Sequence, residues 1–523
     1  MAMEWTFSAL LPVRRHISSS AIPRLIGLML CTLLAGTRVL QAQEIIWSQP
    51  AKNERSLERV RVVASSQTIM HVIEEREGQL RWLRYTTDSL RIKSSADIAG
   101  PSEDFTVEHF FIHTDTLTLI YSGWNKESDQ TEIFIRRFIA DGEPVGESKL
   151  VHARFENSKP KKSGIECVLS PDSLSMLLFF DSDVERKQTE GISFKCYNHS
   201  LQLLWEKELR LPATPDLLQV HHFLLDNKAG VYMMSGRNPI KTFADWQRPQ
   251  GGQYVVYYYE PYGKRLKQYD IGLKDKQVIS VEFALNSKQE VVIAGYYSNN
   301  FKFKAAGTLY FTIQAFGGSM KKAAYTPFTE EFIEEITVGG KETLEDFYLD
   351  YLYLHPDGRA ILVGEQYYVS RYVSTDPTTG RQMVEYRYNF DDIMVNCLDT
   401  GATHAWNLRI PKRQFTNAPS DRNFSYAFDP APAGLSITFN DDNASTDRLN
   451  SKEDFQASLW TGSKNSVTTF CYVGMDGIQH RSTLVDNNAE RLLFNPLIVS
   501  SAPIGQAIFG FDDNRTYKFC RRR

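Results

Sequence analysis

Short apolar runs alternate with turn residues along most of the chain, and the pattern is clearest between Asp346 and Lys412. Two runs are joined by a tight turn, a polar stretch follows, and a second pair of runs is joined by another tight turn. The runs are Phe347–Leu354, Ala360–Tyr368, Ile393–Leu398 and Ala405–Ile410, and the turns are His355-Pro356-Asp357-Gly358 and Asp399-Thr400-Gly401. Such runs, with Asp, Pro and Gly between them, are typical of antiparallel strands. This stretch therefore predicts a four-stranded antiparallel meander.

Fainter copies of this unit recur along the chain, over residues 57–98, 104–151, 164–212, 217–271, 278–325 and 424–484. The C-terminal stretch supplies three more strands, one short of a unit, and Glu44–Pro50 supplies one isolated strand. Repeats of about 45 to 65 residues are typical of β-propeller blades. We predict an all-β fold, a single β-propeller of eight four-stranded antiparallel blades with seven as the alternative count, closed by pairing of the N- and C-terminal strands.

One stretch departs from the strand pattern, and one other architecture has to be weighed. The stretch Pro327–Ile336 interrupts the strand pattern, and Thr329 followed by two glutamates is typical of a helix start, so we expect a short helical insertion over residues 327–345. The rival architecture is a pair of β-sandwiches. That architecture would not explain a repeat that stays in phase over so many units.

The N-terminal segment has the pattern of a secretory signal. Arg14, Arg15 and Arg24 precede the apolar run Leu25–Ala35, and Leu40-Gln41-Ala42 is similar to a small-residue cleavage site. The apolar run is shorter than the roughly 20 residues that a membrane-spanning helix needs. We therefore expect a signal peptide over residues 1–42, a propeller domain over residues 43–523 and no transmembrane segment in the mature chain. Export would place the protein in the periplasm, at the cell surface or outside the cell.

Composition narrows the classes of partner. The net charge is -4, so the chain offers no excess of basic residues that would neutralise nucleic-acid phosphates. After the signal peptide five cysteines remain, scattered without CxxC pairs, which argues against a zinc site and a dense disulfide framework. We interpret these cysteines as small apolar residues within strands, with one disulfide bridge as the alternative.

The predicted loops differ between the two faces of a propeller. Turns joining first to second and third to fourth strands are short, whereas segments joining second to third strands are long in three units. The long segments are Arg237–Gln253, Gln366–Asn389 and Asp441–Ser466. A face that carries elaborated loops is the usual place for binding, although long surface loops are also tolerated as insertions. We predict that the long-loop face binds a partner.

Aromatic and arginine side chains gather in two of these segments. Such side chains together suit a sugar, a peptide or a protein surface. The candidate ligand-binding residues are Trp246, Tyr367, Tyr368, Arg371, Tyr386 and Arg387. The alternative for Gln366–Asn389 is a β-hairpin extension that stacks its own aromatic residues.

Acidic residues recur where second strands end, and Asp441 and Asp442 are the candidates of this kind for ligand binding. Clustered carboxylates could hold Ca²⁺ or act as an acid and base on a glycoside. The simpler interpretation is that Asp and Asn begin turns by bonding to their own backbone. No DxDxDG loop is present, so we predict no cofactor and no metal site, with Ca²⁺ as the alternative.

The unit from Asp346, together with Ile410–Gln414, Ser425-Tyr426-Ala427 and Phe439–Asn443, resembles uncharacterised exported β-propeller proteins of Bacteroidetes-type bacteria. This resemblance implies the same fold and export, and it brings no catalytic residues. The leading hypothesis is an exported binding or scaffolding propeller that uses the long-loop face for a protein, peptide or glycan. The alternative is a polysaccharide hydrolase or lyase, which would need carboxylates, or a carboxylate with Tyr, His or Arg, to converge in one pocket.

Overall fold

The structure is a computed structural model. It describes residues 45–50, 57–66, 68–76, 79–98, 105–113, 115–155, 165–181, 191–210, 219–237, 253–262, 264–299, 304–321, 324–337, 344–375, 380–418, 423–447, 457–462, 464–496, 508–512 and 517–522. The expected signal peptide and Trp246 lie outside these residues. The description below concerns the compact unit from Ile46 to Arg521.

The described residues form eight antiparallel sheets, which follow one another in chain order. The first sheet holds β2 (Leu57–Ser65), β3 (Ile69–Arg76), β4 (Gln79–Thr86) and β5 (Ile92–Ile98). The second holds β6 (Phe105–His113), β7 (Thr116–Asn125), β8 (Gln130–Phe138) and β9 (Lys149–Phe155). The third holds β10 (Ile165–Leu169), β11 (Ser175–Asp181), β12 (Gly191–Asn198) and β13 (Leu203–Arg210). The fourth holds β14 (Gln219–Leu225), β15 (Val231–Arg237), β16 (Gln253–Glu260) and β17 (Arg265–Ile271).

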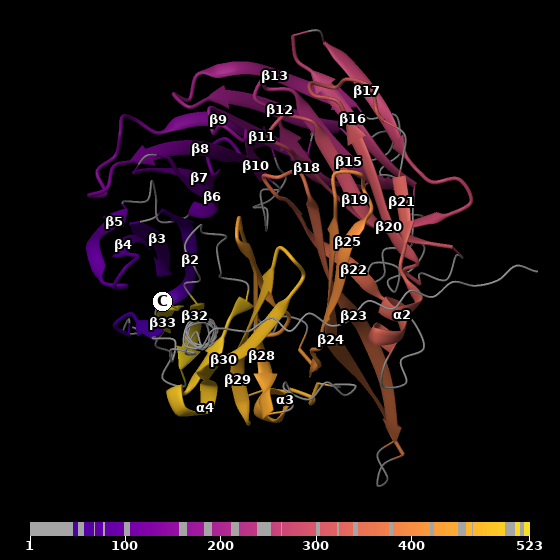
Figure 1. Ribbon diagram of the computed structural model, residues 1–523. Coiled ribbons are helices and arrows are strands. Elements are labelled where there is room, and N and C mark those ends of the chain that lie inside the picture. The colour runs from indigo at the N-terminus through magenta and orange to yellow at the C-terminus, as the bar shows by residue number, and fades with distance from the viewer. Residues whose placement is uncertain are drawn as a thin grey trace, which may run out of the picture. The chain divides into compact units, whose positions relative to one another are not determined.

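The remaining sheets keep this order, with additions in the sixth and eighth (Figure 1). The fifth holds β18 (Gln277–Leu285), β19 (Val291–Ser298), β20 (Gly307–Ile313) and β21 (Ala324–Pro327). The sixth holds β22 (Phe347–Leu354), β23 (Ala360–Thr375), β24 (Gln382–Leu398), β25 (His404–Ile410) and β26 (Gln414–Thr416). The seventh holds β27 (Ala427–Ala431), β28 (Gly434–Asp442), β29 (Ser466–Gly474) and β30 (Gln479–Asp486). The eighth holds β31 (Leu492–Phe494), β32 (Ile508–Asp512), β33 (Tyr517–Arg522) and β1 (Ile45–Trp47).

Within the described ranges, three short helices accompany the sheets: α2 (Glu330–Thr337), α3 (Asn443–Asp447) and α4 (Asn487–Glu490). At the start of α2, the backbone N–H of Phe332 donates to Thr329 Oγ1 at 3.3 Å. Phe328, Phe332 and Ile336 bury the apolar side of this segment against the fifth and sixth sheets. None of the helices among the described residues is long and apolar enough to cross a membrane.

The tight turns follow the chemistry expected from the sequence. Gly358 has φ of +97°, and its N–H donates to the His355 carbonyl at 2.9 Å. A residue without Cβ adopts this backbone conformation without strain, so the Pro-Asp-Gly sequence closes the β22–β23 turn. The Asp226 and Asp399 carboxylates likewise accept backbone N–H groups two and four residues further on, which is how Asp stabilises a turn.

Hydrophobic clusters between consecutive sheets hold them together. Apolar residues of the first and second, second and third, third and fourth, fourth and fifth, fifth and sixth, and sixth and seventh sheets form six such clusters. Between the seventh and eighth sheets, Asn440 Nδ2 donates to the Phe494 carbonyl at 2.7 Å. Each fully buried Leu, Ile, Val or Phe contributes about 1.5–3 kcal/mol. These clusters therefore supply much of the stability of the unit.

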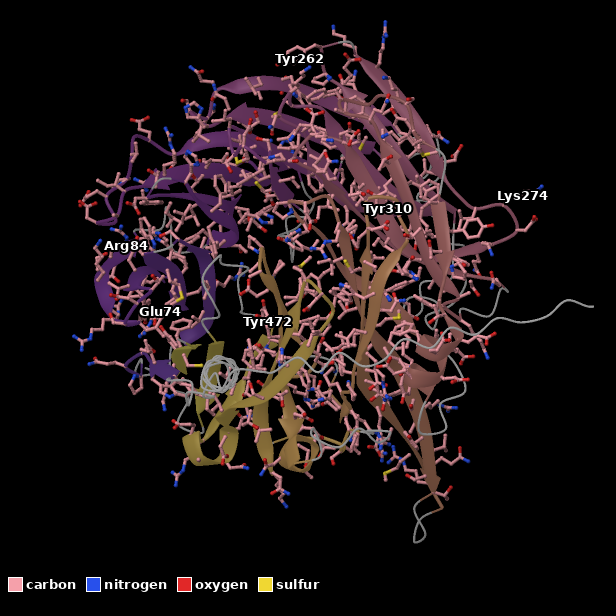
Figure 2. All side chains as sticks on the ribbon, viewed as in Figure 1. Glu74, Arg84, Tyr262, Lys274, Tyr310 and Tyr472 are labelled. Atoms are coloured by element: carbon pink, nitrogen blue, oxygen red, sulfur yellow. The ribbon has the colours of Figure 1, made fainter. Side chains whose placement is uncertain are left out.

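The eighth sheet connects the end of the unit to its beginning. β1 lies beside β33 in this sheet, where the Ser48 N–H donates to the Phe519 carbonyl at 2.8 Å. Tyr517 and Phe519 pack against Val60 and Met70 of the first sheet. The Tyr517 hydroxyl also donates to Glu74, which Figure 2 labels on the first sheet. The sheets thus form a ring in which the last packs on the first. The protein is a β-propeller of eight blades.

The cysteines in strands behave as small apolar residues. Cys196, Cys397, Cys471 and Cys520 are buried, Cys167 is half-buried, and these five form no disulfide with one another. Burial raises the pKa of the Cys471 thiol to about 12. The interpretation from the sequence is confirmed for these positions.

Candidate functional site

The segment between the second and third strands of the sixth blade is a β-hairpin, not the polar loop that the sequence suggested. From Tyr367 onward β23 pairs only with β24, as far as the Thr375–Gln382 pair. Figure 1 shows these two strands extending past their neighbours at the lower right of the view. The segment alternates β-branched and aromatic residues with polar ones, which favours strands over a loop. The segment therefore forms a hairpin extension, as the alternative expected.

One face of this hairpin carries valine and tyrosine side chains with one arginine, and the described residues leave it uncovered. Val373 pairs with Val384, Arg371 with Tyr386, and Val369 with Tyr388, and paired residues share a face. The exposed fractions are 49% for Val373, 45% for Val384 and 49% for Tyr386. We call this surface the open face, defined by Val369, Arg371, Val373, Val384, Tyr386 and Tyr388. Exposed aliphatic and aromatic side chains in one patch mark an interaction surface.

β26 pairs with β24 along one edge of the hairpin, and the opposite face carries Tyr372 and Met383, which are 45% and 56% exposed. The Arg387 guanidinium lies 4.2 Å from the Tyr372 ring centroid and 4.9 Å from that of Phe415. Asn417 Nδ2 donates to Glu385 Oε1 at 2.6 Å, and β26 pairs with β24. Cation–π contacts and strand pairing thus hold the hairpin in place. Arg387, a candidate ligand-binding residue, lies inside this support.

Tyr367 and Tyr368 lie at the base of the hairpin. The Tyr368 hydroxyl donates to Asp391 Oδ2 at 3.0 Å, and the Tyr367 ring centroid lies 5.0 Å from that of Phe390. Both side chains are half-buried. Of the five candidates in this segment, the structure brings only Arg371 and Tyr386 together on the open face.

Buried ion pairs fix the base to the blade. Lys412 Nζ lies 2.6 Å from Glu365 Oε1, with side-chain exposures of 0% and 6%. The ammonium also donates to the Phe390 carbonyl at 2.8 Å and to Gln414 Oε1 at 3.1 Å. Nearby, Arg409 Nη2 lies 2.9 Å from Asp392 Oδ2. Buried charges of this kind hold their surroundings in one arrangement, because each would be costly without its partner.

Asp441 and Asp442 make structural contacts within the seventh blade. Asp441 is buried and forms an ion pair with Arg481, while Asp442 Oδ1 accepts the Ala444 N–H at 2.9 Å at the start of α3. The Asp442 contact fits the interpretation that such residues begin turns, whereas Asp441 acts as the partner of a buried cation. Within the described ranges, no group of three or more His, Cys, Asp or Glu residues is arranged to hold a metal ion.

The inner strands share a feature that the apolar pattern did not reveal. The first strands of neighbouring blades lie next to each other, as β18 does to β22, so they form the inner wall of the ring. In five of these strands the pairing register shifts by one residue, twice in β2 and once in each of the others, which indicates β-bulges. The extra residues are Glu58, Val63, Glu108, His221, Ile279 and Asp350.

Asp350 is exposed on the inner wall, and its carboxylate oxygen Oδ2 accepts the Tyr426 hydroxyl at 2.8 Å. The protein atoms crowded around it remove part of its hydration, and Glu365 adds a negative charge, so that its pKa rises to about 8. The neighbouring Ser425 hydroxyl donates to Glu365 Oε2 at 2.8 Å. Ser425 has φ of +69°, an uncommon conformation for a residue other than glycine. The Ser425-Tyr426 pair thus holds both carboxylates through a strained backbone.

Sequence reasoning missed Asp350, Val373 and Val384. The alternation through Val373 and Val384 was a readable signal for the open face. Nothing in a single sequence marks the bulge at Asp350, because the shift appears only in the pairing of β22 with β23.

No protein-family model and no curated protein sequence matches the chain. Solved structures are similar to it at low identity. The propeller domain of the Trilobed protease from Pyrococcus furiosus is 11% identical, with a TM-score of 0.35, over 87% of this chain and 98% of that one. The polysaccharide lyase Uly1 is 9% identical, with a TM-score of 0.37, over 90% and 99%. Prolyl oligopeptidase B from Galerina marginata is 8% identical, with a TM-score of 0.40, over 97% of this chain and 61% of that one. At such identities and scores the likeness says nothing of activity.

Proposed function

We propose that the protein is a binding or scaffolding propeller whose open face docks a protein or peptide partner. The observation that supports this is the exposed pair Val373 and Val384 beside Tyr386 on a hairpin held rigid at its base. Aliphatic side chains add contact area with a protein, whereas sugar rings are bound by aromatic faces and hydrogen bonds. The open face therefore favours a protein or peptide over a glycan.

The test compares a face variant with a matched control. The variant combines Val373→Thr, Val384→Thr and Tyr386→Ser, which keep β-branched residues in both strands. The control is Tyr262→Ser, which removes a 73%-exposed aromatic ring from the turn after β16 (Figure 2). Partners captured by the purified protein would be produced individually and titrated by calorimetry. We expect the face variant to bind at least about tenfold more weakly, the effect of losing a buried anchor, and the control to bind normally.

Equal binding by the face variant would overturn the proposal. A glycan array run in parallel, with alanine substitutions at Tyr367, Arg371 and Trp246, tests the glycan alternative directly. Glycan binding that those substitutions abolish would favour it.

The second candidate function is hydrolysis or lysis of a polysaccharide, favoured by one observation. Asp350 and Tyr426 bring a carboxyl of raised pKa to a tyrosine hydroxyl on the inner wall, as acid–base chemistry requires. Glu365 is occupied by Lys412, so a second free carboxylate is lacking at this place. Cleavage of a polysaccharide by the wild type that Asp350→Asn abolishes would support the enzyme.

We also propose that the protein is exported, on the pattern of residues 1–42 and the resemblance to exported propellers of Bacteroidetes-type bacteria. N-terminal sequencing of the protein recovered from its native cells is the test. A mature chain starting near Gln43 is expected, and an intact N-terminus in the cytoplasm would contradict export.

A further inference from the structure

A cavity of about 190 Å³ lies between the second and third blades. It is lined by residues at the ends of β6, β7 and β11 and from the turns after β10 and β12. These turns join first to second and third to fourth strands, so the cavity belongs to the face of short turns. The open face of the hairpin extends from the opposite end of the blades.

Strand register builds one wall of this cavity. Phe111 pairs with Thr118 and Thr118 with Arg137, so these three side chains form a row across β6, β7 and β8. His113 and Thr116 form the next row. Because residues paired across strands share a face, all five side chains point toward the third blade.

The floor of the cavity is apolar. Leu169 and Leu201 pack against the hydrophobic cluster that joins the second and third blades, and Met176 is a buried member of it. A ligand resting there would remove apolar surface from water on both sides, which is favourable in proportion to the area covered.

The polar side chains of the cavity are a guanidinium, two imidazoles, an amide and hydroxyls. No aspartate or glutamate lines it. Arg137 is half-buried, and within the described part of the chain its guanidinium has one hydrogen bond, from Nη1 to the His199 carbonyl at 3.3 Å. The hydroxyls of Thr116, Thr118 and Ser175 likewise make no side-chain hydrogen bond among the described residues.

The nearest acidic side chains are engaged elsewhere. Asp115 lies 3.0 Å from Arg84 Nη2, on the first blade. Asp172 accepts the Ser170 hydroxyl at 2.6 Å. A partly desolvated guanidinium beside free hydroxyls and an apolar floor therefore lacks a negative partner, and such a cation is costly unless it is paired.

We propose that this cavity is a binding site for a small organic carboxylate. The carboxylate would take two hydrogen bonds from Arg137 and further ones from Thr118 and Ser175, while its apolar body lies on Leu169 and Met176. Guanidinium groups favour carboxylates because their parallel N–H donors match the two oxygens. A cavity of about 150 Å³ holds a benzene molecule, so the volume suits an acid of the size of benzoate.

The test is a titration of the full-length protein with benzoate and butyrate, followed by NMR or calorimetry. We expect the wild type to bind these acids saturably. Arg137→Gln should bind them at least about tenfold more weakly, the usual effect of removing a charge-assisted hydrogen bond. Arg136→Gln is the matched control. Arg136 precedes Arg137 on β8 but lies over Phe138, with its Cζ 5.5 Å from the ring centroid, and it does not line the cavity.

Two further ligands test separately whether the negative charge and the apolar body are needed for binding. Benzyl alcohol keeps the ring and lacks the charge, so it should bind much more weakly than benzoate. Inorganic phosphate keeps a charge and lacks the apolar body, so it should compete poorly. Unchanged benzoate binding by Arg137→Gln, equal binding of benzyl alcohol, or binding of phosphate alone would overturn the site. A thermal unfolding scan of each variant shows whether a loss of binding reflects a loss of folded protein.

Discussion

Asp350 shows how the surroundings of one residue set the response of the whole protein to pH. Its carboxyl would release its proton near pH 3.8 in the unfolded chain, but in the folded protein it keeps the proton up to about pH 8. Between these values this carboxyl holds a proton in the folded state that it releases in the unfolded state. The contribution of Asp350 to the free energy of unfolding should therefore fall as pH rises from about 4 to 8 and level off above that range.

Asp350→Asn should reduce this decline, because an amide does not titrate and its oxygen can still accept from Tyr426. Urea unfolding at pH 5, 6.5 and 8 measures the effect. The variant keeps a pH dependence of its own, because burial also raises the pKa of Glu282 to about 7 and lowers the pKa values of His71 and His404 to about 4, so the difference between the two proteins is the readout. Equal slopes for variant and wild type would contradict the assignment.

Gly364 is a residue whose missing side chain matters. A Cβ there would lie 2.3 Å from the Tyr348 carbonyl oxygen and 3.1 Å from the Tyr296 hydroxyl. We expect Gly364→Ala to destabilise the protein by about 1–3 kcal/mol, the usual cost of overpacking a core. Gly272→Ala is the control, because a Cβ there meets no atom within 4 Å. Denaturant midpoints should fall for the first variant and stay level or rise for the second.

At the scale of elements, the hairpin depends on the buried pair of Lys412 and Glu365. Lys412→Met should lower the free energy of unfolding by about 3–5 kcal/mol, because it leaves a buried carboxylate without its cation. The double variant Lys412→Met with Glu365→Leu should recover much of that loss. Urea unfolding of the four proteins in this cycle gives the coupling. If the double variant were as unstable as the sum of the single variants, the pair would not act as a unit.

The sequence was sufficient for most elements and for their grouping into eight blades, because alternating apolar positions and Asp, Pro or Gly turns record strand pairing locally. It was insufficient where contacts between distant parts of the chain determine whether a side chain is free to bind a ligand. Arg387 and Tyr368 have the composition of a binding site, yet contacts with Phe415 and Asp391 make them supports. Arg137 was not singled out, because its exposure to a cavity depends on residues of the next blade, from Leu169 to Leu201.

At the scale of the whole molecule, β1 covers an edge that would otherwise be open. A chain beginning at Ala51 should unfold at a lower temperature than one beginning at Gln43, and it should form oligomers through the bare edge of β33. Thermal scans and light scattering after gel filtration compare the two. Identical melting and mass would show that β1 contributes nothing to the ring.

The composite eighth blade also has a consequence for the order of folding. The Phe519 N–H donates to Ser48 Oγ across 471 positions of sequence. Contacts between residues so distant form slowly, because a long loop must close before any contact stabilises it. The seven continuous blades can therefore assemble from local contacts before β1 pairs with β33. The ring is sealed only after the last strand has been synthesised, so a nascent chain halted before Tyr517 would hold seven finished blades and an open seam.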